Sequence, residues 1–319
     1  MLTLPPSESA PTPPAANPDL SVQIGNLRMQ NPVTVASGTF GYGPEYAELV
    51  DLDRLGAIVV KGIRMEPTFG NPTPRTVETA SGLINAIGLP GPGVEGFVRD
   101  YLPFLRRHTV PVIVNIWGRT LEEYGEVAAR LDGVEGVHAL EINVSCPNIK
   151  EGSRAFGTNV DTFQRVVALV RSRTRLPVIP KLAPNVPDIA AFARAAEECG
   201  ADGISLINSI PAMAIDIETR RPKLGNVTGG LTGPAIHPVA VKLVWEAARA
   251  VRIPVIGMGG IASAADALEF IIAGASAVAV GTANFVRPTA PLDVLEGIRA
   301  YFVRHGLASL GELRGTLRL

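Results

Sequence analysis

Residues 139–148 read ALEINVSCPN, an apolar run that ends in a cluster of hydrogen-bonding and reactive side chains. The first half predicts a buried strand, because its apolar residues are continuous enough to be covered on both faces. Pro147 removes a backbone donor and disfavours helix at Cys146, so we expect the chain to turn there. A thiol at such a corner faces whatever lies above the strand ends.

The same pattern recurs along the chain as a short apolar run, a Gly/Pro/Asn-rich loop and an amphipathic helix. Helical spacing is clear in Pro187–Cys199, where Gly200 provides a stop signal, and Leu268–Ala275 ends in the same way. Strands that alternate with helices predict an α/β protein, a closed (β/α)₈ TIM barrel rather than an open doubly wound sheet. The predicted strands are Pro32–Ser37, Ala57–Gly62, Val110–Trp117, Ala139–Cys146, Pro177–Ala183, Gly203–Asn208, Pro254–Gly259 and Ala277–Gly281.

The domain organisation follows from what lies outside these repeats. Residues 1–19 are rich in Pro, Ala and Ser and lack a signal-peptide pattern, so we predict a disordered leader before a single barrel domain over 20–319. Leu20–Gln30 predicts a β-hairpin lid over one barrel end. Two connections, Ile63–Thr109 and Ser209–Arg252, are too long for plain crossovers. Long loops after barrel strands build the functional site in this fold.

Composition excludes several function classes. A net charge of −1 with 5% aromatic residues gives no footprint for nucleic acid or an anionic membrane surface. The apolar runs are too short to span a bilayer. Two cysteines, Cys146 and Cys199, argue against a disulfide framework. The histidines lack metal-site spacing and predict surface or capping positions and no metal: His108, His138, His237 and His305.

Polar residues gather at the carboxyl ends of the predicted strands. A lysine at the end of a buried strand is costly unless it is paired or serves a ligand, and a structural ion pair is the alternative for Lys61 and Lys181. Together the strand ends predict a polar pocket, made by Ser37, Gly38, Thr39, Lys61, Gly62, Asn115, Asn143, Ser145, Cys146, Lys181, Asn208 and Ser209.

The last two strands add a predicted phosphate site. Gly259-Gly260 leads into a helix with Ser263 as its N-cap, and Gly281-Thr282 offers free amides beside it. Gly257–Ala262 also matches the dinucleotide pattern GxGxxA, but no first βαβ unit and no acidic ribose partner accompany it.

Cys146 taken alone is most simply a small buried residue, as we expect for Cys199 on its apolar helix face. Its position on a rim with two lysines favours a catalytic thiol. No histidine lies near Cys146 on this rim, since His138 is at the other end of the same predicted strand. The lack of a histidine partner favours proton abstraction over nucleophilic attack. Cations facing an electron-poor ring stabilise the charge that develops on reduction. The set therefore predicts flavin mononucleotide (FMN) chemistry, with Cys146 removing a proton while a hydride passes to the flavin.

Four motifs in order along roughly residues 20–310 resemble the dihydroorotate dehydrogenase family: Val60–Gly62, Asn85–Leu89, Asn143–Asn148 and Gly229–Gly233. A cysteine base, Ala155–Thr158 and Ala214–Asp216 resemble the NAD-linked B type of class 1. The membrane-bound class has a serine base and an N-terminal membrane helix, whereas this leader has neither apolar length nor an amphipathic pattern.

The resemblance implies specific ligands. Cys146, with Lys61 beside it, takes the C5 proton of dihydroorotate while the C6 hydride goes to flavin N5, and orotate leaves for cytoplasmic pyrimidine (UMP) synthesis. Substrate contacts are implied for Lys61, Asn85, Ala86, Ile87, Gly88, Leu89, Asn143, Asn208 and Ser209. FMN contacts are implied for Ser37, Lys61, Gly62, Asn115, Asn143, Lys181, Ile207, Gly233, Gly259, Gly260, Gly281 and Thr282.

The B type also implies a partner. Electrons would pass to a separate subunit that carries FAD and a 2Fe–2S cluster and reduces NAD, because this chain lacks the cysteines for a cluster. We expect a homodimer that forms a heterotetramer with that subunit.

The sequence departs from the family pattern at a few positions, and other functions are compatible with it. The family has Thr where Ser209 stands, Ile210–Ala212 is unusual after the sixth strand, and Trp117 and Arg119 replace small residues. Trp117 is either core or pocket wall. The alternatives are a fumarate-linked A-type enzyme, a dihydropyrimidine dehydrogenase-like flavoenzyme, a phosphate-binding Schiff-base lyase acting through Lys181, and a non-catalytic scaffold barrel.

Overall fold

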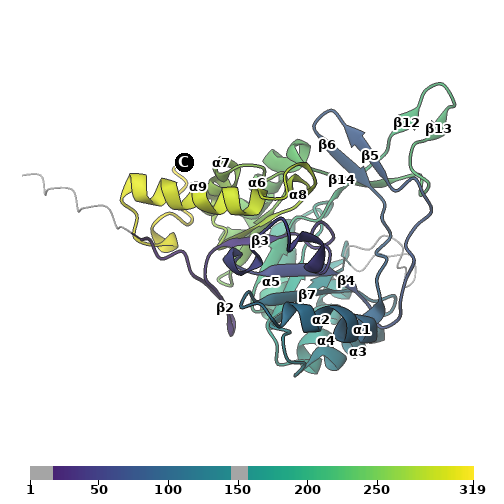
Figure 1. The fold of residues 1–319 in the computed structure, drawn as a ribbon, viewed down its shortest axis with the longest axis horizontal. Helices are drawn as coiled ribbons and strands as arrows, with labels where there is room; N and C mark the ends of the chain where they lie inside the picture. Colours follow the sequence, from purple (N-terminus) through teal and green to yellow (C-terminus); the bar gives the residue numbers. More distant parts are fainter. Residues whose placement is uncertain (1–16, 145–156) are drawn as a thin grey trace, which may run out of the picture.

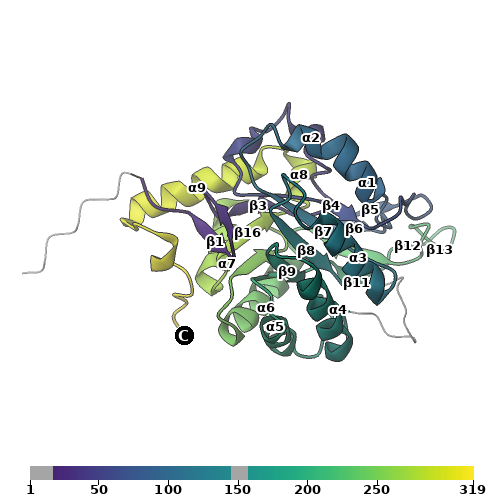
Figure 2. The same cartoon turned by 90° about the horizontal axis from the view of Figure 1, so that it is seen from below.

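The protein, seen in a computed structural model that describes residues 17–144 and 157–319, is built around an eight-stranded parallel sheet. The strand order is β3-β16-β15-β10-β9-β8-β7-β4. Its two outer strands meet, since Thr34 forms a parallel bridge with Ala57 and the Gly56 N–H donates to the Val33 carbonyl at 2.8 Å. The sheet therefore closes into the predicted barrel (Figure 2). The strands are β3 (Val33–Val35), β4 (Ile58–Ile63), β7 (Val112–Ile116), β8 (Ala139–Asn143), β9 (Val178–Lys181), β10 (Ile204–Leu206), β15 (Val255–Met258) and β16 (Ala277–Val280).

Helices cover the outside of the barrel (Figure 2). The predicted helix after β9 is α5, which starts when the Asp188 carboxylate accepts the N–H groups of Ala190 and Ala191 and is followed by Gly200 at φ 81°. Its apolar face is buried, and the Phe192 ring packs edge-on against Phe163, with ring centroids 5.3 Å apart. The long helices are α3 (Leu121–Leu131), α4 (Val160–Arg173), α5 (Ile189–Glu198), α6 (His237–Ala250), α7 (Ala264–Ala273) and α9 (Ala290–His305), and the short ones are α8 (Ala283–Val286), η1 (Pro44–Tyr46), η2 (Leu52–Arg54) and η5 (Leu310–Glu312).

A hairpin and a polar network lie at the amino ends of the strands. The hairpin pairs β1 (Val22–Ile24) with β2 (Leu27–Met29), and a Cβ added at Gly203 would lie 2.9 Å from Ile24 Cγ2, so the hairpin packs beside the start of β10.

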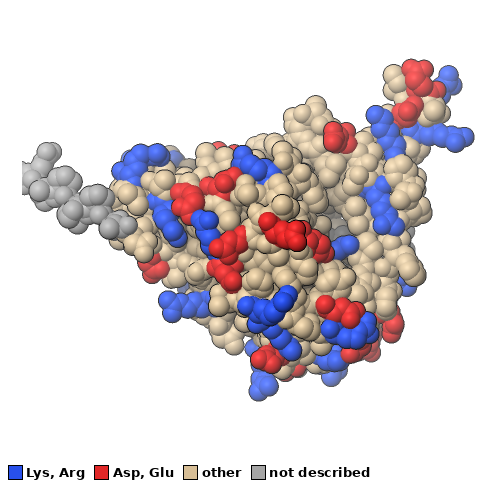
Figure 3. All heavy atoms as spheres, viewed as in Figure 1, with Lys and Arg blue, Asp and Glu red and all other residues tan. Residues whose placement is uncertain are grey.

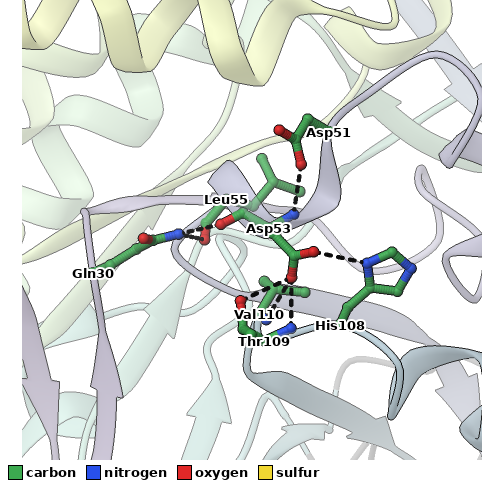
Figure 4. A network of polar contacts seen from close by, with 7 residues as sticks. All are labelled: Gln30, Asp51, Asp53, Leu55, His108, Thr109 and Val110. Atoms are coloured by element: carbon green, nitrogen blue, oxygen red, sulfur yellow. Dashed lines mark hydrogen bonds and ion pairs between the residues drawn. The ribbon is translucent and has the colours of Figure 1, made fainter.

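In the network, the Asp53 carboxylate accepts from His108 Nδ1 at 3.0 Å, from the Thr109 hydroxyl at 2.9 Å and from the Thr109 and Val110 backbone N–H groups (Figure 4). Gln30 donates to the Asp53 carbonyl on the other side. These contacts fasten η2, which precedes β4, to the segment that enters β7.

The two long connections pack together. The one after β4 contains β5 (Thr76–Thr79), β6 (Gly82–Asn85), α1 (Gly93–Gly96), η3 (Phe97–Tyr101) and α2 (Leu102–Leu105). The one after β10 contains β11 (Ile210–Ala212), β12 (Ile215–Asp216), β13 (Arg221–Pro222), β14 (Gly229–Thr232) and η4 (Pro234–Ile236). Their strands form one antiparallel sheet in the order β11-β14-β6-β5, from which the β12–β13 hairpin projects (Figure 1). The unusual Ile210–Ala212 segment is thus a strand of this sheet.

The surface agrees with the near-neutral net charge. Lys and Arg side chains are interspersed with Asp and Glu over the face in Figure 3. Within 17–144 and 157–319, no helix combines the length and the apolar character needed to cross a membrane.

Candidate functional site

A cavity of about 380 Å³ lies at the carboxyl ends of the barrel strands. Every barrel strand contributes to its wall, either from its last residues or from the loop that follows. All of the residues predicted to hold FMN line it: Ser37, Lys61, Gly62, Asn115, Asn143, Lys181, Ile207, Gly233, Gly259, Gly260, Gly281 and Thr282.

A second cavity of about 290 Å³ adjoins the first. Its wall comes largely from the two long connections, mostly from their loops and partly from their strands. The predicted substrate residues other than Lys61 all line it, namely Asn85, Ala86, Ile87, Gly88, Leu89, Asn143, Asn208 and Ser209. Six of these residues also line the larger cavity and so mark the boundary between the two: Asn85, Ile87, Leu89, Asn143, Asn208 and Ser209.

The predicted base, Cys146, lies outside the described residues, as do Ser145, Pro147, Asn148, Ala155 and Phe156. The residues on either side of this segment are described. Asn143 lines both cavities, and Gly157 and Thr158 line the smaller one.

The two predicted lysines differ in their contacts. Lys181 is buried, with Nζ 3.8 Å from Glu141 Oε1 and 3.5 Å from Ser37 Oγ. It is therefore both an ion-pair partner and part of the cavity wall. The Lys61 ammonium is half-buried and has no hydrogen-bond or ion-pair partner in the described part of the chain. Burial lowers the pKa of Lys61, against an opposing effect of Glu45 and with a smaller reinforcing effect of Arg75. Of these two lysines, Lys61 is thus the one whose ammonium is available to a ligand.

Hydrogen bonds fix the amides at the boundary of the cavities. Asn208 Nδ2 donates to Asn143 Oδ1 at 3.2 Å, and the Ser209 N–H donates to Asn208 Oδ1 at 2.8 Å. The buried Tyr124 hydroxyl donates to the Asn143 carbonyl at 2.8 Å, which anchors the end of β8. A Cβ on Gly230 would overlap the Ser209 side chain, so glycine at this position of the Gly229–Gly233 motif leaves room for the Ser209 hydroxyl.

Glycine loops form the wall at β15 and β16. Gly260 has φ 70°, and a Cβ there would lie 2.8 Å from both the Gly233 carbonyl oxygen and His237 Cβ. Within the described ranges, the N–H groups of Gly260 and Thr282 have no acceptor and remain available to an anion. Ser263 caps α7 as predicted.

The first turn of α7 is less available than we expected. The Asp266 carboxylate accepts the N–H groups of Ala262 at 2.9 Å and Ser263 at 2.8 Å, which completes a capping box. An anion at this end of the cavity is therefore served by the loop amides of Gly260 and Thr282.

Two residues of the site were missed by the sequence reasoning. His237, treated as a surface or capping residue, lies 3.1 Å through Nδ1 from the Gly259 carbonyl and so supports the glycine loop. Glu141 lies inside the barrel, 2% exposed, below Lys181 and Asn115. The signal for Glu141 was present, because a carboxylate in the middle of a buried strand requires partners.

Trp117 and Cys199 pack in or against the core and lie outside the walls of both cavities. Trp117 is 4% exposed and belongs to the core, with the Arg64 guanidinium 5.5 Å from its ring centroid, and it is absent from the walls of both cavities. Cys199 is half-buried against the core, and burial raises the pKa of its thiol. Among the described residues, no group of His, Cys, Asp and Glu is arranged to hold a metal ion.

Comparison with known proteins agrees with this geometry. The family model described as dihydroorotate dehydrogenase matches residues 19–302. The dihydroorotate dehydrogenase B (NAD(+)) catalytic subunit of Desulforamulus reducens is 56% identical over 301 residues, which cover 94% of this chain and 99% of that protein. Proteins of the same name from Geotalea uraniireducens and Thermoanaerobacter pseudethanolicus are each 53% identical, over 94% of this chain and 98% and 99% of their own lengths. This chain, with its two adjoining cavities and with similarity over nearly its whole length, therefore belongs to the dihydroorotate dehydrogenase family.

Proposed function

We propose that this chain oxidises dihydroorotate to orotate with FMN, as the catalytic subunit of a class 1 B-type enzyme of UMP synthesis. One observation carries the proposal: the predicted cofactor residues line one cavity, and the predicted substrate residues line its neighbour, with Asn143 and Asn208 in both walls. Two ligands that must exchange a hydride need such adjoining sites.

The chain fits FMN at the larger cavity. A volume of about 380 Å³ lies within the range of small-molecule sites. The free N–H groups of Gly260 and Thr282 suit a phosphate, while Lys181 and Asn115 suit the polar edge of a flavin ring. A Cβ at Gly62 would lie 2.9 Å from Asn115 Oδ1, so the glycine keeps this wall clear for a flat ring. When bound, FMN supplies the acceptor for a hydride.

The protein side chains supply binding and proton transfer. Lys61, which lines the cavity and has no hydrogen-bond or ion-pair partner in the described chain, would pair with the carboxylate of dihydroorotate. The amides of Asn143, Asn208 and Asn85 would bind the polar edges of its ring and orient C5 and C6. Cys146, as thiolate, would take the C5 proton, with no histidine needed as an intermediary.

We further propose a partner subunit. The relatives from Desulforamulus reducens and Geotalea uraniireducens are named catalytic subunits of an NAD-linked enzyme. With two cysteines in the whole sequence, this chain cannot supply the four thiolates of a 2Fe–2S cluster. A separate subunit with FAD and a 2Fe–2S cluster would therefore carry electrons to NAD, on a homodimer of this chain.

The test begins with purified protein reconstituted with FMN. We expect a yellow protein that converts dihydroorotate, prefers it to dihydrouracil, and reduces NAD only with the FAD and 2Fe–2S subunit present. Failure to bind FMN contradicts the proposal. Preference for dihydrouracil indicates a dihydropyrimidine dehydrogenase-like enzyme, and full turnover with fumarate alone indicates the A type.

The Schiff-base alternative has a separate test. Lys181 Nζ already lies 3.8 Å from Glu141 Oε1 as an ion-pair partner, a structural role that differs from that of an amine nucleophile. Borohydride should therefore trap no substrate on Lys181. A stable adduct there would replace the flavin proposal with lyase chemistry.

A further inference from the structure

Glu141 occupies the interior of the barrel directly beneath the larger cavity. Its Oε1 accepts from Asn115 Nδ2 at 2.7 Å and lies 3.8 Å from Lys181 Nζ. Its Oε2 accepts from Ser205 Oγ at 2.7 Å. The side chains of Glu141 and Lys181 are only 2% and 6% exposed. Asn115 and Lys181 line the cavity, whereas Glu141 and Ser205 do not.

The contact with Asn115 fixes the direction of its amide. A carboxylate can only accept hydrogen bonds, so Asn115 must turn its NH₂ group towards Glu141. Its carbonyl oxygen then lies beside Gly62, on the cavity side. Without Glu141, either end of this amide can face the cavity.

The contact with Lys181 fixes a charge. A buried ammonium and a buried carboxylate at this distance interact strongly, and removal of one leaves the other uncompensated. A ligand in the cavity therefore faces Lys181 with the Glu141 carboxylate behind it, and not an isolated cation.

We propose that Glu141 is a positioning residue for the cofactor: it orients Asn115 and Lys181 towards the cavity and offsets the charge of Lys181, and so sets the reduction potential of the bound flavin. The inference rests on the proposed function only in that FMN occupies the larger cavity. It does not depend on the identity of the reducing substrate.

The main variant is Glu141→Gln in the FMN-loaded protein, with the potential measured by photoreduction against a reference dye. Gln keeps the shape, its carbonyl can accept from Asn115, and its NH₂ can donate to the Ser205 hydroxyl. It removes the negative charge. We expect the equilibrium constant for reduction to rise by at least about tenfold, which is about 30 mV for a two-electron couple. An unchanged or lowered potential overturns the proposal.

A second variant should shift the flavin reduction potential in the opposite direction. Ser205→Ala removes a donor to Glu141 and leaves its carboxylate less neutralised, so the potential should fall. This variant also keeps the proposal falsifiable if Glu141→Gln does not fold. A rise in the potential of Ser205→Ala contradicts the proposal.

FMN affinity separates the orienting role from the charge. Glu141→Ala leaves Asn115 unheld and should weaken FMN binding by more than about tenfold, whereas Glu141→Gln should stay within about threefold of the wild type. Equal affinities for the two variants would remove the orienting role.

The matched control is Glu123→Gln. Glu123 is also a buried glutamate in an ion pair, 2.6 Å from Arg64 Nε, but it does not line either cavity. It should lower the unfolding temperature with little change in flavin potential. A shift as large as that of Glu141→Gln would show that any buried ion pair has this effect, and the proposal would fail.

The two proposals fail separately. Photoreduction needs no dihydroorotate, so a flavin that accepts light-driven electrons but not those of dihydroorotate refutes the proposed function and leaves the test of Glu141 valid.

Discussion

Adding one methyl group at Gly260 should change FMN affinity and folding stability by amounts that can be measured separately. Gly260 has φ 70°, and a Cβ there would lie 2.8 Å from the Gly233 carbonyl oxygen and from His237 Cβ. Gly260→Ala therefore meets two costs. The left-handed backbone strains alanine by about 1–2 kcal/mol. The contact also forces the loops at Gly260 and Gly233 apart, and both loops line the cavity.

The two costs affect different measurements. Backbone strain is present with and without FMN, so it lowers the free energy of unfolding but not the affinity. Displacement of the loops misplaces the free Gly260 N–H and acts on affinity. If restoring the loop costs about 1–2 kcal/mol, FMN binds roughly 5- to 30-fold more weakly. Quenching of FMN fluorescence by the apoprotein measures this change.

Gly306→Ala is the control. Gly306 has φ 66° at the end of α9, and a Cβ there meets nothing within 4 Å. It should lose about the same stability as the strain in Gly260→Ala and keep the wild-type FMN affinity. Unchanged affinity in Gly260→Ala, or an equal loss in Gly306→Ala, would refute the assignment of this loop to FMN.

Three further perturbations test other parts of the molecule. Asp53→Ala removes the acceptor that joins η2 to the start of β7, and should cost about 2 kcal/mol in thermal unfolding while kcat/KM at 25 °C stays unchanged; a large loss of activity would contradict its structural role. Burial lowers the pKa of His138 against an opposing Gly136 contact, and its Nδ1 accepts the Val112 N–H, so the neutral form is favoured on folding. That stability is present above the unfolded pKa of about 6.5 and is lost as pH falls. The difference between the melting temperatures at about pH 7.5 and 5.5 should be smaller in His138→Asn than in the wild type. An equal difference would show that His138 does not contribute to the pH dependence of stability. Lys61→Met should lower kcat/KM for dihydroorotate roughly 10- to 100-fold, and a wild-type value would remove Lys61 from the substrate site.

The sequence predicted the barrel well because its signals are local. Each buried strand is a short apolar run with turn residues behind it, as in Pro177–Ala183, where the structure has β9 at Val178–Lys181. Strand ends in a parallel barrel share one rim, so polar residues at those ends were placed together correctly, and Asn115, Asn143 and Lys181 all line one cavity.

What the sequence missed depends on contacts between distant residues. Pairing of β14 with β6 joins Gly230 to Asn85, and nothing local in either loop indicates it. Glu141 meets Ser205 from another strand, and His237 reaches the Gly259 carbonyl from the start of α6. The packing of the closed barrel decides which of these polar groups meet, and the spacing of residues in the sequence does not predict those contacts.

The most direct test of the central claim is anaerobic mixing of FMN-loaded protein with dihydroorotate, with flavin absorbance and orotate followed together. We predict rapid bleaching with one orotate formed per FMN reduced, and for Cys146→Ala, loss of about 10² or more in the bleaching rate with FMN still bound. No bleaching of the wild-type flavin, or bleaching by Cys146→Ala at the wild-type rate, would contradict the account.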